Sequence, residues 1–355
     1  MGQQFRFKSR RGSSKVRSAE TQWLGTFFCR ICGVIAVGWL LSSLRSPSSA
    51  PLFQSIGSTI LPSRSDQPAP LDFAAPPVAP LPEEIQLDRD LRRTGSPRPI
   101  SVTWRQVSGV PVYITRIDLQ DPATFISIGL ANRAKTANSP RSTRGDEAFV
   151  GLVRHHRAAL TLSGTFFSMD RQKRVMGNMV AAGQFLKYSP WENYGTTLGL
   201  RAGNRPEMTT ARVQGKPQWQ HHWFSLTAGP RLLWQGKIQI NPKREGFTDP
   251  AVMGVALRSA IGFPKSGQTL LHVTFLKPIS LQQEAQIMRD LGCYEAMNLD
   301  GGTSVAIARG NRILKSAGRE LTNVITVYDV NYPAPKDLRL SWYAFQNQQE
   351  NFARK

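Results

Sequence analysis

The chain has 355 residues, 40% of them hydrophobic, and its 45 Lys and Arg residues outnumber 24 Asp and Glu residues to give a formal net charge of +21. This composition is sufficient for a buried core and indicates a globular protein with attached segments. The charge favours anionic partners such as phosphodiesters, acidic glycans or lipid headgroups. Because no basic motif interleaved with aromatic residues is visible, we predict no nucleic-acid partner.

The first 45 residues combine a basic head with an apolar stretch. Six Lys and Arg residues occupy the first 17 positions, where no acidic residue occurs, and residues 23–44 contain a single charged side chain, Arg30. About 20 apolar residues suffice to cross a bilayer, so residues 1–45 are predicted to be a transmembrane anchor or a cleaved signal peptide. The positive-inside rule then places the rest of the chain on the extracytoplasmic, periplasmic side.

Residues 46–100 hold 11 of the 24 prolines, mixed with Ser, Ala and short charged patches. Such a composition stays extended and cannot form a core, so we predict a disordered linker that separates the domain from the membrane. Ordered structure is expected to begin near residue 101. Residues 112–119 alternate apolar and polar side chains as a half-buried strand does, and residues 124–131 follow as a second strand.

Two helices are predicted within the domain. Residues 143–157 carry apolar side chains at helical spacing, and the run 158–167 resumes as a strand. Ser280 begins the second helix, because Gln283 completes a capping box and Gly292 lies where the helix should stop. We therefore predict one α+β domain of mixed β-sheet with a few helices.

The predicted domain covers residues 101–332 and is followed by a polar tail over residues 333–355. Cys293 is the single cysteine of this domain, so no disulfide within it is expected. The adjacent histidine pairs at 155–156 and 221–222 point to different sides of an element and make poor chelates, so we predict no metal and no cofactor.

The segment "MNLDGGTSV" at residues 297–305 places Asp300, Gly301 and Gly302 between two apolar runs. Asp-Gly between such runs is a strong hairpin signal. The competing interpretation is a substrate-binding loop. Further glycine-rich patches occur at residues 162–170, 174–180, 227–233 and 257–263, and Arg258 begins the apolar run of the last of these.

Taken in order, these patches resemble the phosphodiester glycosidase family. The family's Asn-Gly-Gly-Phe-Phe segment corresponds to residues Ser163–Phe167, and its Gly-Asn segment to Gly177–Asn178. Its Arg-Thr-Ala-Ile-Gly segment corresponds to Arg258–Gly262, and its Asn-Leu-Asp-Gly-Gly-Gly-Ser segment to Asn298–Ser304. A closing Arg-x-x-x-Asn strand corresponds to Arg319–Asn323.

The resemblance covers residues 110–330 and has four departures. Ser163 stands where the family has Asn, Thr165 and Thr303 where it has Gly, and Ser259 where it has Thr. With the high positive charge, these departures keep an alternative open, a non-catalytic module that binds anionic cell-envelope glycan or lipid.

The resemblance implies an enzyme, a hydrolase that cleaves the glycosidic C–O bond of a sugar-1-phosphodiester in an envelope or extracellular glycoconjugate. Phosphate is a good leaving group, so such a site needs anion stabilisers more than a strong general acid. We expect Arg258 to grip the phosphate in a bidentate fork, and the N–H groups of Gly301 and Gly302 to form an anion-binding nest. Asp300 would stabilise positive charge at the sugar carbon or activate water. The alternative for Arg258 is a structural pairing with a buried carboxylate.

A second carboxylate is expected for most glycoside hydrolysis. Asp170, Glu192 and Glu295 are candidates, and Asp170 is preferred because it follows the Gly-Thr-Phe-Phe loop. The matched segments also imply the substrate-binding residues, which are Ser163, Gly164, Asn178, Gly229, Asn298, Gly301, Gly302, Thr303, Ser304, Arg319 and Asn323.

Overall fold

The computed structural model describes residues 96–138 and 145–353. The predicted anchor and residues 46–95 of the predicted linker lie outside these residues. Within the described ranges, no helix has both the length and the apolar character needed to span a membrane.

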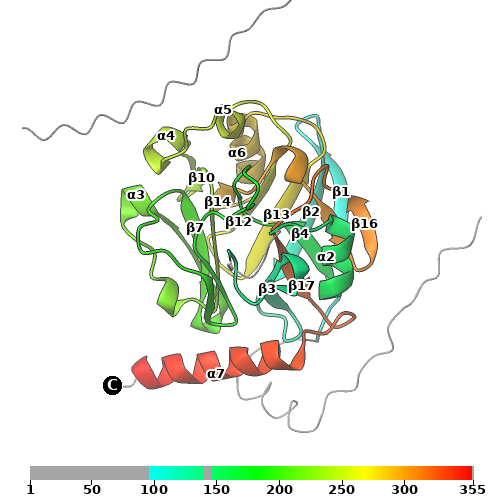
Figure 1. Cartoon of the computed structure of the whole chain (residues 1–355), viewed down its shortest axis with the longest axis vertical. Helices are drawn as coiled ribbons and strands as arrows, with labels where there is room; N and C mark the ends of the chain where they lie inside the picture. Colours follow the sequence, from blue (N-terminus) through cyan, green and yellow to red (C-terminus); the bar gives the residue numbers. More distant parts are fainter. Residues whose placement is uncertain (1–95, 139–144, 354–355) are drawn as a thin grey trace, which may run out of the picture. The chain divides into compact units, whose positions relative to one another are not determined.

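The described residues form three β-sheets (Figure 1). The seven-stranded first sheet has the order β1 (Val102–Val107), β2 (Val110–Asp118), β13 (Thr269–Phe275), β12 (Ser259–Phe263), β14 (Glu295–Asn298), β10 (Arg231–Trp234) and β11 (Lys237–Ile238). The five-stranded second sheet has the order β16 (Arg312–Lys315), β15 (Ile307–Arg309), β4 (Leu160–Ser163), β17 (Asn323–Tyr328) and β3 (Phe125–Leu130). The five-stranded third sheet has the order β6 (Gln184–Lys187), β5 (Met179–Ala181), β9 (Phe224–Ala228), β7 (Thr196–Arg201) and β8 (Arg205–Thr210).

Neighbouring strands of the described sheets pair antiparallel, for example β12 with β14 and β17 with β4. The helices are α2 (Phe149–His156), α3 (Ala211–Gln214), α4 (Pro242–Glu245), α5 (Pro250–Met253), α6 (Leu281–Asp290) and α7 (Lys336–Ala353). Short 3-10 turns are η1 (Ala131–Arg133), η2 (Ala202–Asn204), η3 (Trp219–His221) and η4 (Gly302–Ser304). The α+β class is confirmed, and the one mixed sheet that we expected is divided into three antiparallel ones.

A central apolar core joins the three sheets. It includes Ile261 from the first sheet, Leu162 and Ile325 from the second, and Leu198 and Leu226 from the third, each of them fully buried. Helix α6 covers the other face of the first sheet and α2 covers that of the second. The three sheets therefore pack around one shared core, and the loops at their strand ends extend from a packed scaffold.

The helix expected from Ser280 is confirmed in detail. The Ser280 hydroxyl accepts from the N–H of Gln283, whose side chain accepts from the N–H of Ser280, so the capping box is complete. The helix predicted over residues 143–157 is shorter, because Glu147 forms a β-bridge with Leu321 and the helix begins only at Phe149.

The strand predicted over residues 158–167 ends at Ser163, where the glycine loop begins. The segment expected as a polar tail contains helix α7 (Figure 1). Trp342, Tyr343 and Phe345 of this helix are buried in the central core. The many polar residues of the segment concealed this apolar face from the sequence interpretation.

Candidate active site

The Asp-Gly-Gly segment does not form a hairpin. Strand β14 before it pairs with β12 and β10 of the first sheet, whereas β15 after it pairs with β4 and β16 of the second. The segment therefore crosses between two sheets, with η4 inside it. The hairpin interpretation is therefore wrong.

Loops from all three sheets meet at this crossing. The N–H of Asp300, after β14, donates to the Gly164 carbonyl after β4 at 3.2 Å. The Thr165 hydroxyl donates to the carbonyl of Thr227 in β9. The sequence patches that looked separate are thus joined by hydrogen bonds at one place in the fold.

Glycine is required at position 164 because the neighbouring strand approaches closely. A Cβ atom at Gly164 would lie 2.0 Å from the Asn323 Oδ1 atom. That oxygen accepts from the N–H of Thr165 at 2.8 Å, and the Asn323 amide donates back to the Thr165 carbonyl at 3.1 Å. Asn323 therefore fixes the Gly164 loop from behind and does not itself reach the cleft.

A cleft of about 600 Å³ opens beside these loops, which is within the size range of small-molecule sites. Aromatic side chains form much of its wall: Phe166, Phe167, Tyr194 and Phe247. Its polar lining comes chiefly from three arginines and two carboxylates, which are Arg212, Arg258, Arg319, Asp249 and Asp300. Apolar walls with a few convergent polar groups are typical of ligand sites.

Asp300 is buried in the cleft lining and held on several sides. Arg319 Nη2 donates to Asp300 Oδ2 at 3.1 Å, and its Nε donates to the Ser304 hydroxyl at 2.6 Å. The Ser304 hydroxyl and the N–H of Gly301 donate to the Asp300 carboxylate. Burial raises the pKa of Asp300 from 3.8 to about 6, and these hydrogen bonds with the Arg319 charge oppose that rise. A carboxyl group with a pKa of about 6 is suited to general acid–base catalysis near neutral pH.

Arg319 is itself positioned by an aromatic ring. Its guanidinium carbon lies 4.3 Å from the centre of the Phe167 ring, a cation–π distance. Phe167 belongs to the Gly-Thr-Phe-Phe loop, so the first and last matched segments cooperate in orienting Asp300.

Arg258 lines the cleft, but its donors are largely used within the protein. The side chain donates to one amide oxygen and three backbone carbonyls, which are Asn298 Oδ1 at 3.3 Å, Ile279 O at 3.1 Å, Val252 O at 3.1 Å and Gly254 O. Its Nε atom lies 3.7 Å from the buried Glu284 carboxylate. Within the described residues, these four hydrogen bonds leave one of its five N–H donors unused. A bidentate grip on phosphate is therefore excluded in this geometry, and the structural alternative is favoured.

The N–H groups of Gly301 and Gly302, which were expected to form an anion-binding nest, also have acceptors within the protein. The N–H of Gly302 donates to the Leu257 carbonyl at 2.8 Å, and that of Gly301 points to the Asp300 carboxylate. Glycine is needed here for another reason. A Cβ at Gly301 would lie 2.7 Å from the Leu257 carbonyl oxygen, and Gly302 has a φ of 57°. These glycines bring the Asp300 loop against the chain before β12.

The candidates for a second carboxylate lie away from the cleft. Asp170 is fully exposed and caps its own turn, and hydrogen bonds from Ser168 and the following N–H groups lower its pKa. Glu295 forms a buried ion pair with Arg231, and Glu192 pairs with Lys187. The carboxylate that sequence reasoning missed is Asp249, an exposed cleft residue that caps helix α5 by accepting from the Ala251 N–H at 2.8 Å. The Asp-Pro step at its position is a helix-start signal that was available in the sequence.

Three other predicted binding residues are structural. Ser163 is buried in β4, where its hydroxyl accepts from the Ala306 N–H at 3.4 Å. The Asn178 side chain bonds both backbone groups of Ser189, at 2.7 and 3.1 Å. Gly229 accepts from the Asn298 amide at 2.8 Å.

The predicted residues that line the cleft are Arg258, Asn298, Asp300, Gly301, Gly302, Thr303 and Arg319. Tyr194, Arg212 and Phe247 line it as well and were not predicted. No local pattern marks these three residues, because the third sheet and helices α3 and α4 bring them to the cleft. Figure 1 shows α3 and α4 lying side by side.

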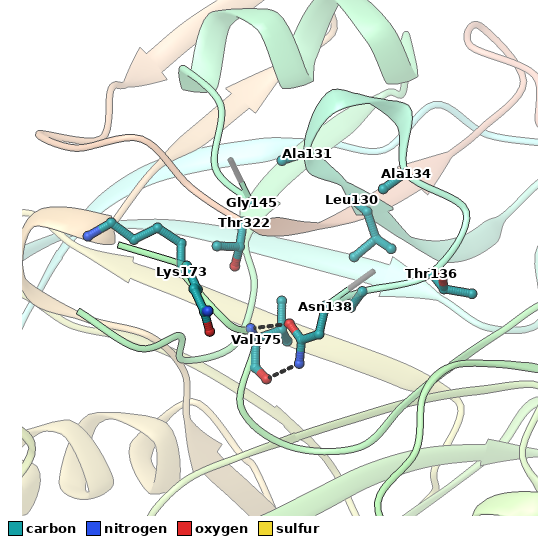
Figure 2. Close-up of a pocket in the computed structure, with 11 residues that line it drawn as sticks. Leu130, Ala131, Ala134, Thr136, Asn138, Gly145, Lys173, Val175 and Thr322 are labelled. Carbon is teal, nitrogen blue, oxygen red and sulfur yellow. Dashed lines mark hydrogen bonds between the residues drawn. The ribbon is translucent and has the colours of Figure 1, made fainter. Parts of the chain in front are cut away.

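A second cavity, of about 40 Å³, lies between Leu130, Lys173 and Thr322 (Figure 2). The Asn138 side chain in its wall accepts a hydrogen bond from the Val175 N–H at 2.7 Å and donates one to the Val175 carbonyl at 3.0 Å. This volume admits water molecules but not a sugar. In the ranges that the structure describes, no group of three or more His, Cys, Asp or Glu side chains is placed to hold a metal ion.

Residues 156–328 match the family model described as phosphodiester glycosidase. No curated protein sequence matches the chain. The catalytic domain of zebrafish N-acetylglucosamine-1-phosphodiester alpha-N-acetylglucosaminidase, solved auto-inhibited by its pro-peptide, matches with a TM-score of 0.50 and 15% identity over 64% of this chain and 82% of that one.

A hypothetical protein from Synechocystis matches with a TM-score of 0.49 and 18% identity over 64% of this chain. The chain spans only 61% of the length of that protein. A Burkholderia pseudomallei protein matches with a TM-score of 0.46 and 14% identity, covering 64% of this chain and 74% of its own. Identities this low show a likeness of fold alone. The family model confirms the resemblance seen in the motifs: over residues 156–328 the chain is similar to the phosphodiester glycosidase family.

Proposed function

We propose that the protein hydrolyses a sugar-1-phosphodiester and breaks the glycosidic C–O bond with phosphate as the leaving group. The match of residues 156–328 to the phosphodiester glycosidase model supports a glycosidase-type hydrolase that acts on phosphodiester-linked sugars. The observation that carries the proposal is the buried Asp300 in the cleft, held by Arg319 and Ser304 and with a pKa of about 6.

The chemistry follows from this arrangement. The leaving phosphate needs no strong acid, so the main barrier is the positive charge that develops at the sugar carbon. Ionised Asp300 stabilises that charge or accepts a proton from the attacking water. Arg319 fixes the carboxylate through Oδ2, and the aromatic wall that includes Phe166 and Phe247 offers apolar faces to a sugar ring.

We further propose that the site lies on the extracytoplasmic side of a membrane and acts on an envelope or extracellular glycoconjugate. The support is the basic head and apolar stretch of residues 1–45, which lie outside the described residues. Protease added to intact spheroplasts should digest the domain, and a protected domain would contradict this location.

One observation favours the alternative of a non-catalytic module for anionic envelope glycan or lipid. The anion donors expected at Arg258, Gly301 and Gly302 are used within the protein, which leaves fewer groups to stabilise a leaving phosphate. Under this alternative, acidic polymers bind with an affinity that falls steeply with salt, and no sugar phosphodiester is turned over.

A panel of sugar-1-phosphodiesters separates the two functions. Wild type should release sugar from at least one diester, and Asp300→Asn should lower the rate on the order of 100-fold, a typical effect of removing transition-state stabilisation. Asp170→Asn is the matched control, because that carboxylate is exposed and outside the cleft. A rate unchanged in Asp300→Asn would remove the proposed role of Asp300.

A further inference from the structure

A phosphodiester substrate brings a negative charge into the cleft, and it needs donors that the fold has not already used. Most donors of Arg258 and the N–H of Gly302 are engaged by backbone carbonyls. Arg319 is engaged by Asp300. Placing the phosphate on Arg319 would also bring it beside the Asp300 carboxylate, where like charges repel. The substrate anion therefore requires another cation in the cleft.

Arg212 of helix α3 is such a cation. Its Nε atom donates to the Asn193 carbonyl at 2.9 Å, and its two terminal nitrogens make no hydrogen bond to any of the described residues. The guanidinium lies across Gly246, where an added Cβ would be 2.7 Å from the Arg212 Cζ atom. One edge of the guanidinium is thus anchored, and the other edge presents a free two-nitrogen fork at the cleft wall.

Tyr194 supplies a second, independent indication of a ligand. Its phenolic oxygen is buried and has no hydrogen-bond partner within the described residues, although the side chain lines the cleft. The ring is fixed edge-on against Phe247, with ring centres 5.8 Å apart. A buried hydroxyl without a partner is unfavourable, so a ligand oxygen is the natural acceptor for this donor. Asn193, which anchors Arg212, is the residue next to Tyr194.

We propose that Arg212 and Tyr194 form the anion subsite of the cleft, which binds the substrate phosphate apart from the Asp300 and Arg319 pair. The identity of the anion rests on the proposed function. Arg212 donates to two non-bridging oxygens through its free fork, and the Tyr194 hydroxyl donates to one oxygen. The phosphate is then bound by Arg212 while Asp300 stays paired with Arg319, so the two negative groups do not share a guanidinium.

Calorimetric titration of the full chain with inorganic phosphate, at constant ionic strength, tests the subsite directly. Wild type should bind phosphate, Arg212→Ala should weaken binding about 10-fold or more, and Tyr194→Phe should weaken it about 3-fold. Arg205→Ala is the matched control. Arg205 is also exposed and donates from Nε to one carbonyl, that of Ala202 at 3.1 Å, but it does not line the cleft. Its removal should change the affinity less than 2-fold.

Three results would overturn the subsite. They are no phosphate binding by wild type, unchanged binding by Arg212→Ala, and an equal loss in the Arg205→Ala control, which would indicate general charge attraction. Parallel diester hydrolysis separates the two proposals. Hydrolysis that needs Asp300 but is unchanged in Arg212→Ala refutes the subsite and leaves the function standing. Phosphate binding that needs Arg212, in a protein that hydrolyses no diester, supports the subsite and refutes the proposed function.

Discussion

Replacing Asp300 by Asn should stabilise the fold at alkaline pH while it lowers the rate of hydrolysis on the order of 100-fold. The folded-state pKa of Asp300 is raised by burial from 3.8 to about 6. Stability from the neutral acid is therefore fully present below about pH 4 and is lost as the pH rises through about 6. A shift of this size corresponds to about 3 kcal/mol of unfolding free energy at about 1.4 kcal/mol per pKa unit.

Asn cannot ionise and has nearly the shape of the neutral acid. Relative to wild type, Asp300→Asn should gain up to about 3 kcal/mol of unfolding free energy between about pH 4 and pH 8, because only wild type has a charge to bury. Urea denaturation of both proteins at the two pH values measures this difference. Asp170→Asn is the control, since the pKa of that exposed carboxylate is lowered and its replacement should produce no such gain.

An equal change in unfolding free energy at pH 4 and pH 8 would refute this reasoning, because it would show that ionisation of Asp300 does not destabilise the folded protein. A loss of stability confined to pH 8 would show that the ion pair with Arg319 outweighs burial. A gain at pH 8 together with lost hydrolysis would identify Asp300 as a residue whose position costs stability and serves the reaction.

Three further predictions follow from the fold. Gly164→Ala should cost about 2 to 3 kcal/mol in urea denaturation, since its Cβ would lie 2.0 Å from Asn323 Oδ1, whereas Gly318→Ala, with its nearest atom at 3.4 Å, should change stability by about 0.5 kcal/mol at most. His272 is fully buried, which lowers its pKa to about 3, so stability present above about pH 6.5 is lost as the pH falls. His272→Leu should flatten the slope of unfolding free energy against pH between 4 and 6 by up to about 1.4 kcal/mol per unit, and an unchanged slope would contradict this cause. Arg258→Lys should lower the free energy of unfolding by about 3 kcal/mol and should also lower activity, because an ammonium group cannot reach the same set of acceptors. Lost activity with an unchanged free energy of unfolding would instead favour direct contact between Arg258 and the phosphate.

Features that depend on neighbouring residues in the chain were predictable. The Ser280 capping box is a local pattern of side-chain and backbone donors, and it formed as expected. The resemblance of the glycine segments and of the closing Arg319–Asn323 segment to the family pattern also pointed to Asp300 and Arg319, which the fold brings into contact.

Features that depend on hydrogen bonds made across the fold were not predictable. The sequence shows that Arg258 stands at the head of an apolar run, but it cannot show that carbonyls of α5 and the chain before α6 accept from its side chain. No sequence motif marks Arg212 or Tyr194. Within the described residues, the terminal nitrogens of Arg212 and the hydroxyl of Tyr194 have no hydrogen-bond partner, and only the fold reveals this. The site's unoccupied donors are therefore a property of the tertiary structure.

The four departures from the family pattern bear unequally on the choice between hydrolase and binding module. The Ser163 hydroxyl accepts from a strand N–H, and that of Thr165 donates to the Thr227 carbonyl. The Ser259 hydroxyl donates to the Asp300 carbonyl at 3.3 Å. None of these three lines the cleft, because each side chain ties one loop or strand to another.

Thr303 differs, since it is exposed and lines the cleft beside Asp300. A side chain here narrows the space over the crossing, where the family pattern has glycine. Under the proposed function, Thr303 would restrict which substrate reaches Asp300, whereas the contacts of Arg319 with Ser304 and Asp300 are kept. Under the proposed function, the departures therefore favour a changed substrate over a site that has lost its chemistry.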